Sequence, residues 1–76
     1  MVHAFIMVKT AAGRSEDVLQ AVRRLDQISE VHVVAGDFDV IVEADAAEVY
    51  DVLQTASTDV SGLDGVADTK TYMALE

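Results

Sequence analysis

The spacing of apolar and polar positions along this chain predicts six elements of secondary structure. Residues 2–9 are rich in Val, Ile and Phe and are predicted to form a strand. After a break at Gly13, Ser15 is placed to cap a helix that runs to about Gln27. The apolar stripe of this helix recurs every three or four residues and consists of Val18, Leu19, Val22, Leu25 and Ile28.

A hairpin is predicted in the middle of the chain. Residues 31–35 and 38–44 are dominated by Val and Ile and are predicted to be its two strands. Gly36 and Asp37 lie between them as a two-residue loop. A Gly-Asp loop favours a hairpin whose glycine has a positive φ.

The last part of the chain predicts a helix and a strand. Asp45 and Glu48 have the spacing of a capping box, which begins a helix over residues 45–57. The buried stripe of this helix is Val49, Val52, Leu53 and Ala56. A loop over residues 58–65 leads to a fourth strand over residues 67–75. One face of that strand carries Thr69, Thr71, Met73 and Leu75.

The predicted order of strands and helices is β-α-β-β-α-β, which is the ferredoxin-like α+β fold. Right-handed crossovers place both helices on one face of a four-stranded antiparallel sheet, in a single domain over residues 1–76. The other face is also predicted to be apolar, because Phe5, Met7, Val34 and Ile41 contribute to it. A domain this small is only marginally stable alone, so we expect two copies to pair sheet to sheet as a dimeric α+β barrel.

The chain is strongly acidic, with 14 acidic residues against 5 basic ones and a formal net charge of −9 at pH 7. Such a charge repels phosphate backbones, so we expect no direct binding to nucleic acid. The excess of aspartate over lysine is typical of proteins that stay hydrated in concentrated salt. We therefore expect a halophilic protein.

The chain has no cysteine, which excludes disulfides, zinc fingers and cysteine nucleophiles. Its longest apolar run, residues 4–8, is too short to span a bilayer. The first residues lack the pattern of a signal peptide. We expect a cytoplasmic protein that does not contact a membrane.

No catalytic set stands out among the polar residues. His3 and His32 each alternate with apolar neighbours on a predicted strand, and such a pair can hold a metal or haem or act as a general base. No carboxylate has a telling spacing to either histidine, so we expect two partly exposed histidines, no metal and no cofactor. Asp37 and Asp39 can be interpreted as an acid–base pair, but an aspartate that forms the turn is the simpler interpretation. We expect no enzyme.

The hairpin is the most distinctive segment. It places a glycine, two carboxylates and an aromatic ring close together between strands of Val and Ile. Loop N–H groups bind carboxylates, and aspartates bind ammonium groups. This combination is complementary to a free α-amino acid, although a Gly-Asp pair also simply turns the chain.

The segment Val34-Ala35-Gly36-Asp37-Phe38-Asp39-Val40 resembles the [TS]-G-x-[YFW]-D signature of the C-terminal effector domain of the Lrp/AsnC family, known as the RAM domain. The lead-in Ile28-Ser29-Glu30-Val31 and the last-strand residues Gly65-Val66 and Thr69-Lys70-Thr71 are similar to the same family, in the same order. The resemblance covers essentially the whole chain. Ala35 stands where the family often has threonine, and Phe38 keeps an aromatic where the family often has tyrosine or tryptophan.

The resemblance implies an oligomeric, amino-acid-binding effector domain that modulates transcription or amino-acid metabolism. Members pair through their sheets and assemble into octamers or similar rings, with the effector at the interface between dimers. The implied effector-binding residues are Ala35, Gly36, Asp37, Phe38 and Asp39, with additional contacts from Thr69 and Thr71. The family's helix-turn-helix has no counterpart here. The resemblance therefore implies a stand-alone effector domain that does not bind DNA and can co-assemble with full-length Lrp/AsnC regulators.

Two alternatives share the predicted topology. A dimeric α+β-barrel monooxygenase or isomerase would use His3 or His32 on the open sheet face, but no base with an orienting partner can be named from the sequence. An ACT-type regulatory domain would carry a Gly-rich loop after the first strand, which residues 10–13 match only faintly.

The acidic charge predicts a dependence on salt. Raising potassium chloride from about 0.1 M to about 3 M shortens the screening length from roughly 10 Å to less than about 3 Å, which relieves the self-repulsion of the chain. We expect a higher melting temperature at the higher salt concentration, measured by circular dichroism. Equal melting temperatures in the two solutions would exclude the halophilic interpretation.

Overall fold

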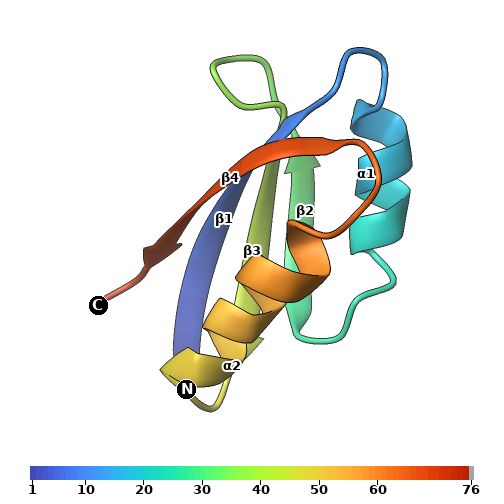
Figure 1. Ribbon diagram of the computed structural model, residues 1–76. Coiled ribbons are helices and arrows are strands. Elements are labelled where there is room, and N and C mark those ends of the chain that lie inside the picture. Colours follow the sequence, from blue (N-terminus) through green and yellow to red (C-terminus); the bar gives the residue numbers. More distant parts are fainter. Residues whose placement is uncertain (76) are drawn as a thin grey trace.

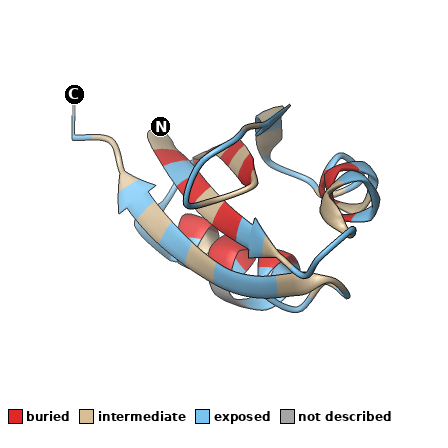
Figure 2. Ribbon diagram, turned by 90° about the horizontal axis from the view of Figure 1, so that it is seen from above, coloured by how far each residue is buried: buried red, intermediate tan, exposed pale blue. Residues whose placement is uncertain are grey.

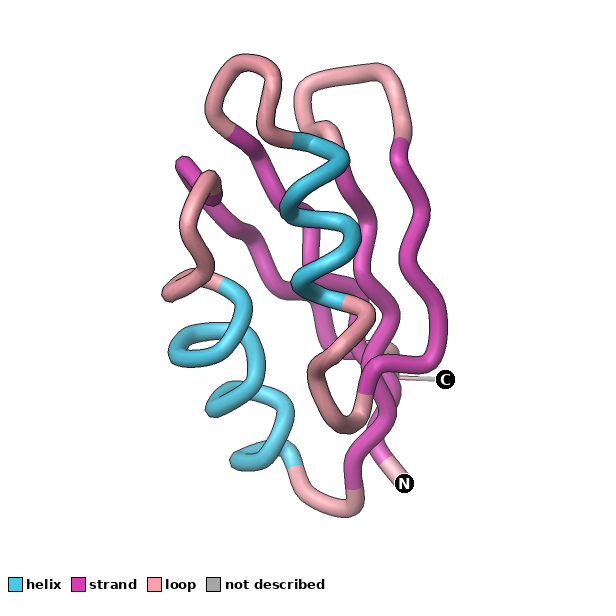
Figure 3. Tube along the Cα trace, turned by 90° about the vertical axis from the view of Figure 1, so that its right-hand side faces the viewer, coloured by secondary structure: helices cyan, strands magenta, loops and turns pink. Residues whose placement is uncertain are grey.

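The computed structural model describes residues 1–75, apart from the side chain of Ser57. Its elements are β1 (Val2–Thr10), α1 (Ser15–Val22), β2 (Ile28–Val33), β3 (Val40–Ala46), α2 (Val49–Gln54), the π-helical segment η1 (Thr55–Val60) and β4 (Val66–Met73). The strands form one sheet in the order β2-β3-β1-β4, and every neighbouring pair is antiparallel. Both helices cover the same face of this sheet (Figures 1 and 3). The predicted ferredoxin-like fold is confirmed.

The core lies between the sheet and the helix layer. Alternate residues of β1 and β3 point into it, so that buried bands recur along these strands (Figure 2). The largest fully buried side chains are Ile6, Val8, Val18, Val22, Val40, Val42, Val52 and Val60. In the described part of the chain, no helix is long and apolar enough to cross a membrane.

Helix α1 is shorter than the sequence predicts. It ends at Val22. The backbone N–H groups of Arg24 and Leu25 then donate to carbonyls three residues earlier, those of Ala21 and Val22, and so form a turn after the helix. Gln27 then takes a left-handed conformation with φ of 71°, which ends the turn and starts β2 early. Leu25 and Ile28 still pack against the core, from the turn and from β2. Leu25 and Ile28 are three residues apart, a spacing that fits a helix, although here one lies in a turn and the other in a strand.

The predicted cap of α1 is also wrong. Ser15 is the first helical residue, and Arg14 takes the cap position without a side-chain capping bond. The Ser15 hydroxyl instead lies 3.2 Å from the Thr10 hydroxyl at the end of β1.

The second helix begins later than the capping signature predicts. Asp45 continues β3 and pairs with His3 of β1, so it does not cap a helix. Glu48 precedes α2 without a side-chain cap bond. Here strand pairing outweighs a local capping signal, because extending β3 places Ala46 in the core.

The buried stripe of this helix differs from the predicted one. Val49 and Leu53 are each 49% exposed, whereas Val52, Ala56 and Val60 are buried. Val49 and Leu53 each precede a core residue by three positions, which places them at the border of the buried stripe. The helix continues past Gln54 as η1 through part of the predicted loop. The buried residues Val52, Ala56 and Val60 therefore recur every fourth position.

The hairpin connection is longer than the predicted two-residue loop. β2 ends at Val33 and β3 begins at Val40, so residues 34–39 connect them. A backbone bond of 2.8 Å from the Val34 N–H to the Asp39 carbonyl closes this connection. Gly36 does not have a positive φ, which corrects the predicted turn geometry. β4 spans Val66–Met73, against the predicted residues 67–75.

Two glycines are expected to respond differently to substitution by alanine. Gly65 has φ of +95°, and an added Cβ would lie 3.1 Å from the Arg14 Cβ and 3.2 Å from a Val18 methyl. We expect Gly65→Ala to lower the free energy of unfolding by about 1–2 kcal/mol or more. An added Cβ at Gly36 meets nothing within 4 Å, so Gly36→Ala should change the free energy of unfolding by less than about 0.5 kcal/mol. Urea denaturation of both variants would contradict this if the two losses were equal.

Candidate functional site

The hairpin predicted to bind an effector projects from one end of the sheet, as the green loop beyond the strands in Figure 1. Ala35, Gly36 and Asp37 at its tip are exposed, and Phe38 and Asp39 are half-buried. The open space around Gly36 leaves its backbone approachable. The connection therefore presents backbone amides and the Asp37 carboxylate to whatever lies against this end of the sheet.

Asp39 ties the hairpin to β1, one of the two inner strands. Its Oδ2 accepts a 2.8 Å hydrogen bond from the Thr10 backbone N–H and a 3.2 Å bond from the Thr10 hydroxyl. Its own backbone N–H donates to the Val8 carbonyl at 3.0 Å. This carboxylate has a structural task, whereas Asp37 is exposed at the tip.

Thr69 and Thr71 lie apart from the hairpin within one chain. They pair with Val8 and Ile6 of β1 and so lie on the helix-facing side of β4. The Thr69 hydroxyl is 2.9 Å from the Ser61 hydroxyl. Because β1 lies between β3 and β4, a single copy does not gather these threonines and the hairpin into one pocket.

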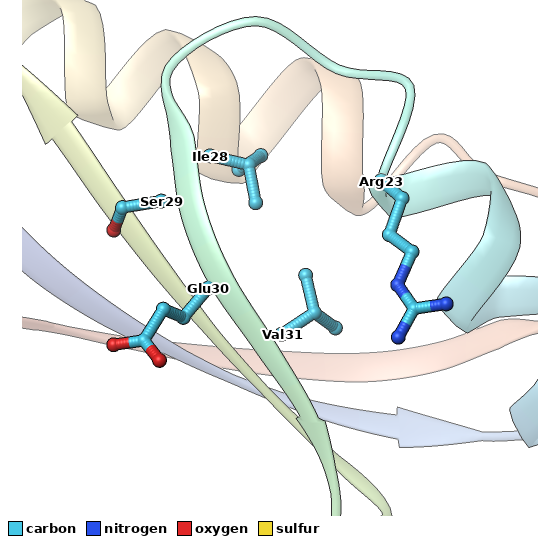
Figure 4. Close-up of a pocket in the computed structure, with 5 residues that line it drawn as sticks. All are labelled: Arg23, Ile28, Ser29, Glu30 and Val31. Carbon is cyan, nitrogen blue, oxygen red and sulfur yellow. The ribbon is translucent and has the colours of Figure 1, made fainter.

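Two open depressions lie elsewhere on the chain. One, of about 320 Å³, lies between the end of α1 and the edge strand β2 (Figure 4). In that view Arg23, Ile28 and Val31 point to one side of β2, and Ser29 and Glu30 to the other. The other depression, of about 220 Å³, is lined by Asp26, Gln27, Asp51, Gln54, Thr55 and Asp59. Neither depression includes a predicted effector residue.

The open face of the sheet is only partly apolar. Phe5, Met7, Ile41 and Tyr72 form an apolar area on it, and Tyr72 is 56% exposed. Val34 lies just beyond the end of β2, where its backbone N–H bonds the Asp39 carbonyl of the facing segment.

The rest of the open face carries what we call the histidine–carboxylate cluster, formed by His3, Glu30, His32, Glu43 and Asp45. His3 Nδ1 lies 2.5 Å from Asp45 Oδ1, and its Nε2 lies 3.0 Å from Glu43 Oε1. His32 Nε2 lies 3.4 Å from the other Glu43 oxygen, Oε2. Glu43 therefore links the two histidines.

His3 is held between two carboxylates. Its hydrogen bonds to Asp45 and then to Glu43 raise the pKa of the imidazole above its usual value. The bond to His3 lowers the pKa of Asp45. In the protonated form, both ring nitrogens of His3 donate to these carboxylates.

Sequence reasoning missed this cluster because it compared positions along the chain. The register pairs His3 with Asp45, Phe5 with Glu43, and Glu30 with Glu43. The available signal was the alternation of Glu43 and Asp45 in a strand of otherwise apolar residues, which places both carboxylates on one face.

Comparison with known proteins agrees with this architecture. A family model described as the Lrp/AsnC ligand binding domain matches residues 3–76. The leucine-responsive regulatory protein of Haemophilus influenzae is 34% identical over 61 residues, which are 80% of this chain and 37% of that protein. The chain thus spans little more than a third of the length of that relative.

Solved structures share the fold. The structure of TTHA0845 from Thermus thermophilus is 25% identical, with a TM-score of 0.94 over 100% of this chain and 95% of that one. The transcriptional regulator NMB0573 from Neisseria meningitidis, solved as a complex with L-Met, has a TM-score of 0.87 at 19% identity, over 99% of this chain and 50% of that one. With the family model matching nearly its whole length, this chain belongs to the Lrp/AsnC ligand-binding domain family.

Proposed function

We propose that this chain binds a free amino acid as an effector, at the hairpin and within an assembly of several copies. The observation that carries the proposal is an anchored hairpin with an exposed tip, in a chain that belongs to a ligand-binding family. The regulator NMB0573 of the same fold was solved with L-Met, and the curated relative from Haemophilus influenzae is named for its response to leucine.

The chemistry of the tip suits the two charged groups of an amino acid. Backbone N–H groups near Gly36 can donate to the α-carboxylate, and Asp37 can accept from the ammonium group. Phe38 contributes an aromatic side chain beside them. Asp39 holds the loop in place through Thr10, so Asp37 is the better ammonium partner of the two aspartates.

A second copy is needed to complete this site. The tip is exposed and lines neither of the two depressions, so one chain alone would leave most of a ligand in water. We propose that Thr69 and Thr71 reach an effector only in the assembly, an octamer or a similar ring.

The open sheet face is the surface proposed for pairing two copies. Its apolar area, formed by Phe5, Met7, Ile41 and Tyr72, would otherwise remain in water. The net charge of −9 opposes contact with DNA. The assembly would then act on transcription by joining full-length relatives.

One observation favours an enzymatic role: the contact of His3 with Asp45 supplies a base with an orienting partner. Both nitrogens of His3 face carboxylates, however, and its raised pKa favours the protonated form. Neither ring nitrogen of His3 is therefore free to take a proton from a substrate, as a general base must. Effector binding is therefore the better-supported function.

The effector site is tested by charge removal. A thermal-shift screen of the twenty amino acids should reveal a ligand, since one present at 100 times its Kd adds about 2.7 kcal/mol of stability. In calorimetry we expect Asp37→Asn to weaken that ligand roughly 10- to 150-fold, because one charge-assisted hydrogen bond is lost.

The matched control is Asp26→Asn, in the exposed turn between α1 and β2 at the opposite end of the sheet from the hairpin (Figure 1), which should bind as the wild type does. Asp39→Asn should lower the melting temperature, since it weakens the contact with Thr10. No stabilisation by any amino acid would refute the proposed function. Equal affinity in Asp37→Asn and the wild type would remove Asp37 as the ammonium partner.

Pairing through the sheet face is tested by placing a charge on it. Phe5→Glu puts a carboxylate into the apolar area, and we expect multi-angle light scattering to give a mass near that of a single 8.2 kDa chain. Tyr50→Glu, at a residue 71% exposed on α2, is the control and should keep the wild-type mass. A wild-type mass of one chain, or an unchanged mass for Phe5→Glu, would exclude this interface.

A further inference from the structure

We propose that the histidine–carboxylate cluster binds a zinc-like divalent transition-metal ion through Glu30, His32 and Glu43. These three residues each offer one ligand atom, and the three atoms all lie within 4.8 Å of one another. This site goes beyond effector binding and uses residues that the hairpin site does not. It replaces the expectation, drawn from the sequence, of two histidines without a metal.

The distances are close to those of a coordination sphere. His32 Nε2 lies 3.4 Å from Glu43 Oε2 and 3.8 Å from Glu30 Oε1. Zinc bonds of about 2.0–2.2 Å separate two tetrahedral ligand atoms by roughly 3.3–3.6 Å. Small rotations of side chains would therefore bring the three atoms into range of one ion.

The backbone that holds these ligands is regular. Glu30 and His32 are alternate residues of β2 and so share a face, and Glu43 pairs with Glu30 from the adjacent β3. Glu43 is the least exposed of the three, with 19% of its side chain accessible, against 50% for His32 and 62% for Glu30. Ligands on paired strands hold their relative positions better than ligands on loops.

A second layer of contacts orients Glu43. His3 Nε2 bonds Glu43 Oε1, and His3 Nδ1 bonds Asp45. This chain of contacts occupies one oxygen of Glu43 and leaves Oε2 facing His32. Outer contacts of this kind are typical of metal sites, where they fix the orientation of a ligating carboxylate. His3 is thus a positioning residue for the metal site.

The donor set selects the class of ion. An imidazole nitrogen with two carboxylates suits zinc and its first-row neighbours, whereas calcium and magnesium prefer oxygen ligands alone. Three protein ligands leave a fourth position for water or another donor. The ion would also offset the repulsion between Glu30 and Glu43, which face each other across the two strands.

The test is a zinc titration of the chelator-stripped full chain, against a competing chromophoric chelator. We expect the wild type to bind one Zn²⁺ per chain, and we expect His32→Gln and Glu43→Gln to lose saturable binding. His3→Gln should weaken binding about 10- to 100-fold, as loss of an outer contact does. Glu16→Gln, which removes an exposed carboxylate on α1, is the matched control and should bind as the wild type does.

A second measurement does not depend on any variant folding. In the wild type, saturating Zn²⁺ should shift the side-chain ¹⁵N signal of His32 to that of a metal-bound Nε2, while His3 keeps its hydrogen-bonded signal. No saturable binding by the wild type would overturn the proposal. Equal binding by His32→Gln, Glu16→Gln and the wild type would do the same, because it would indicate adsorption to an acidic surface. Amino-acid binding measured with chelator present separates this outcome from a failure of the effector site.

Discussion

Strand β1 is hydrogen-bonded along both of its edges, to β3 and to β4, and the other features of the molecule are arranged around it. Its inward residues Ala4, Ile6 and Val8 are fully buried and form part of the sheet surface on which both helices pack. Its outward residues carry the apolar area of the open face at Phe5 and Met7. Burial on one side and pairing on both edges leave this strand no alternative register, because a shift by one residue would exchange its two faces.

The two proposed sites belong to opposite ends of this strand. The last residue of β1, Thr10, holds the hairpin through Asp39, while His3 near its start holds the metal ligand Glu43. Each site is thus fastened by a polar contact to β1, which is paired on both of its edges. An effector and a metal ion would accordingly meet different surfaces of one rigid scaffold.

Much of the fold could be predicted from the sequence because it follows from periodicity. Alternation in β1 and β3 predicts which residues face the core, and the order of elements follows from six clear segments. Boundaries were less predictable where two signals competed. Asp45 and Glu48 match a capping box, yet Asp45 pairs with His3 in the sheet, since the core contact of Ala46 favours extension of β3. The cluster around Glu43 depends on register between strands distant in sequence, which spacing along the chain does not reveal.

The sheet has two edges, β2 and β4, and both discourage further strands from joining. β2 bears exposed Glu30 and His32 and shifts its register between Ile28 and Glu30, and β4 exposes Lys70. Charged side chains and irregular pairing at an edge oppose continuous sheet growth between molecules. Copies of this chain are therefore expected to associate through their sheet faces and loops, and such contacts can form closed oligomers. Pairing at the strand edges, which would propagate as fibres, is disfavoured.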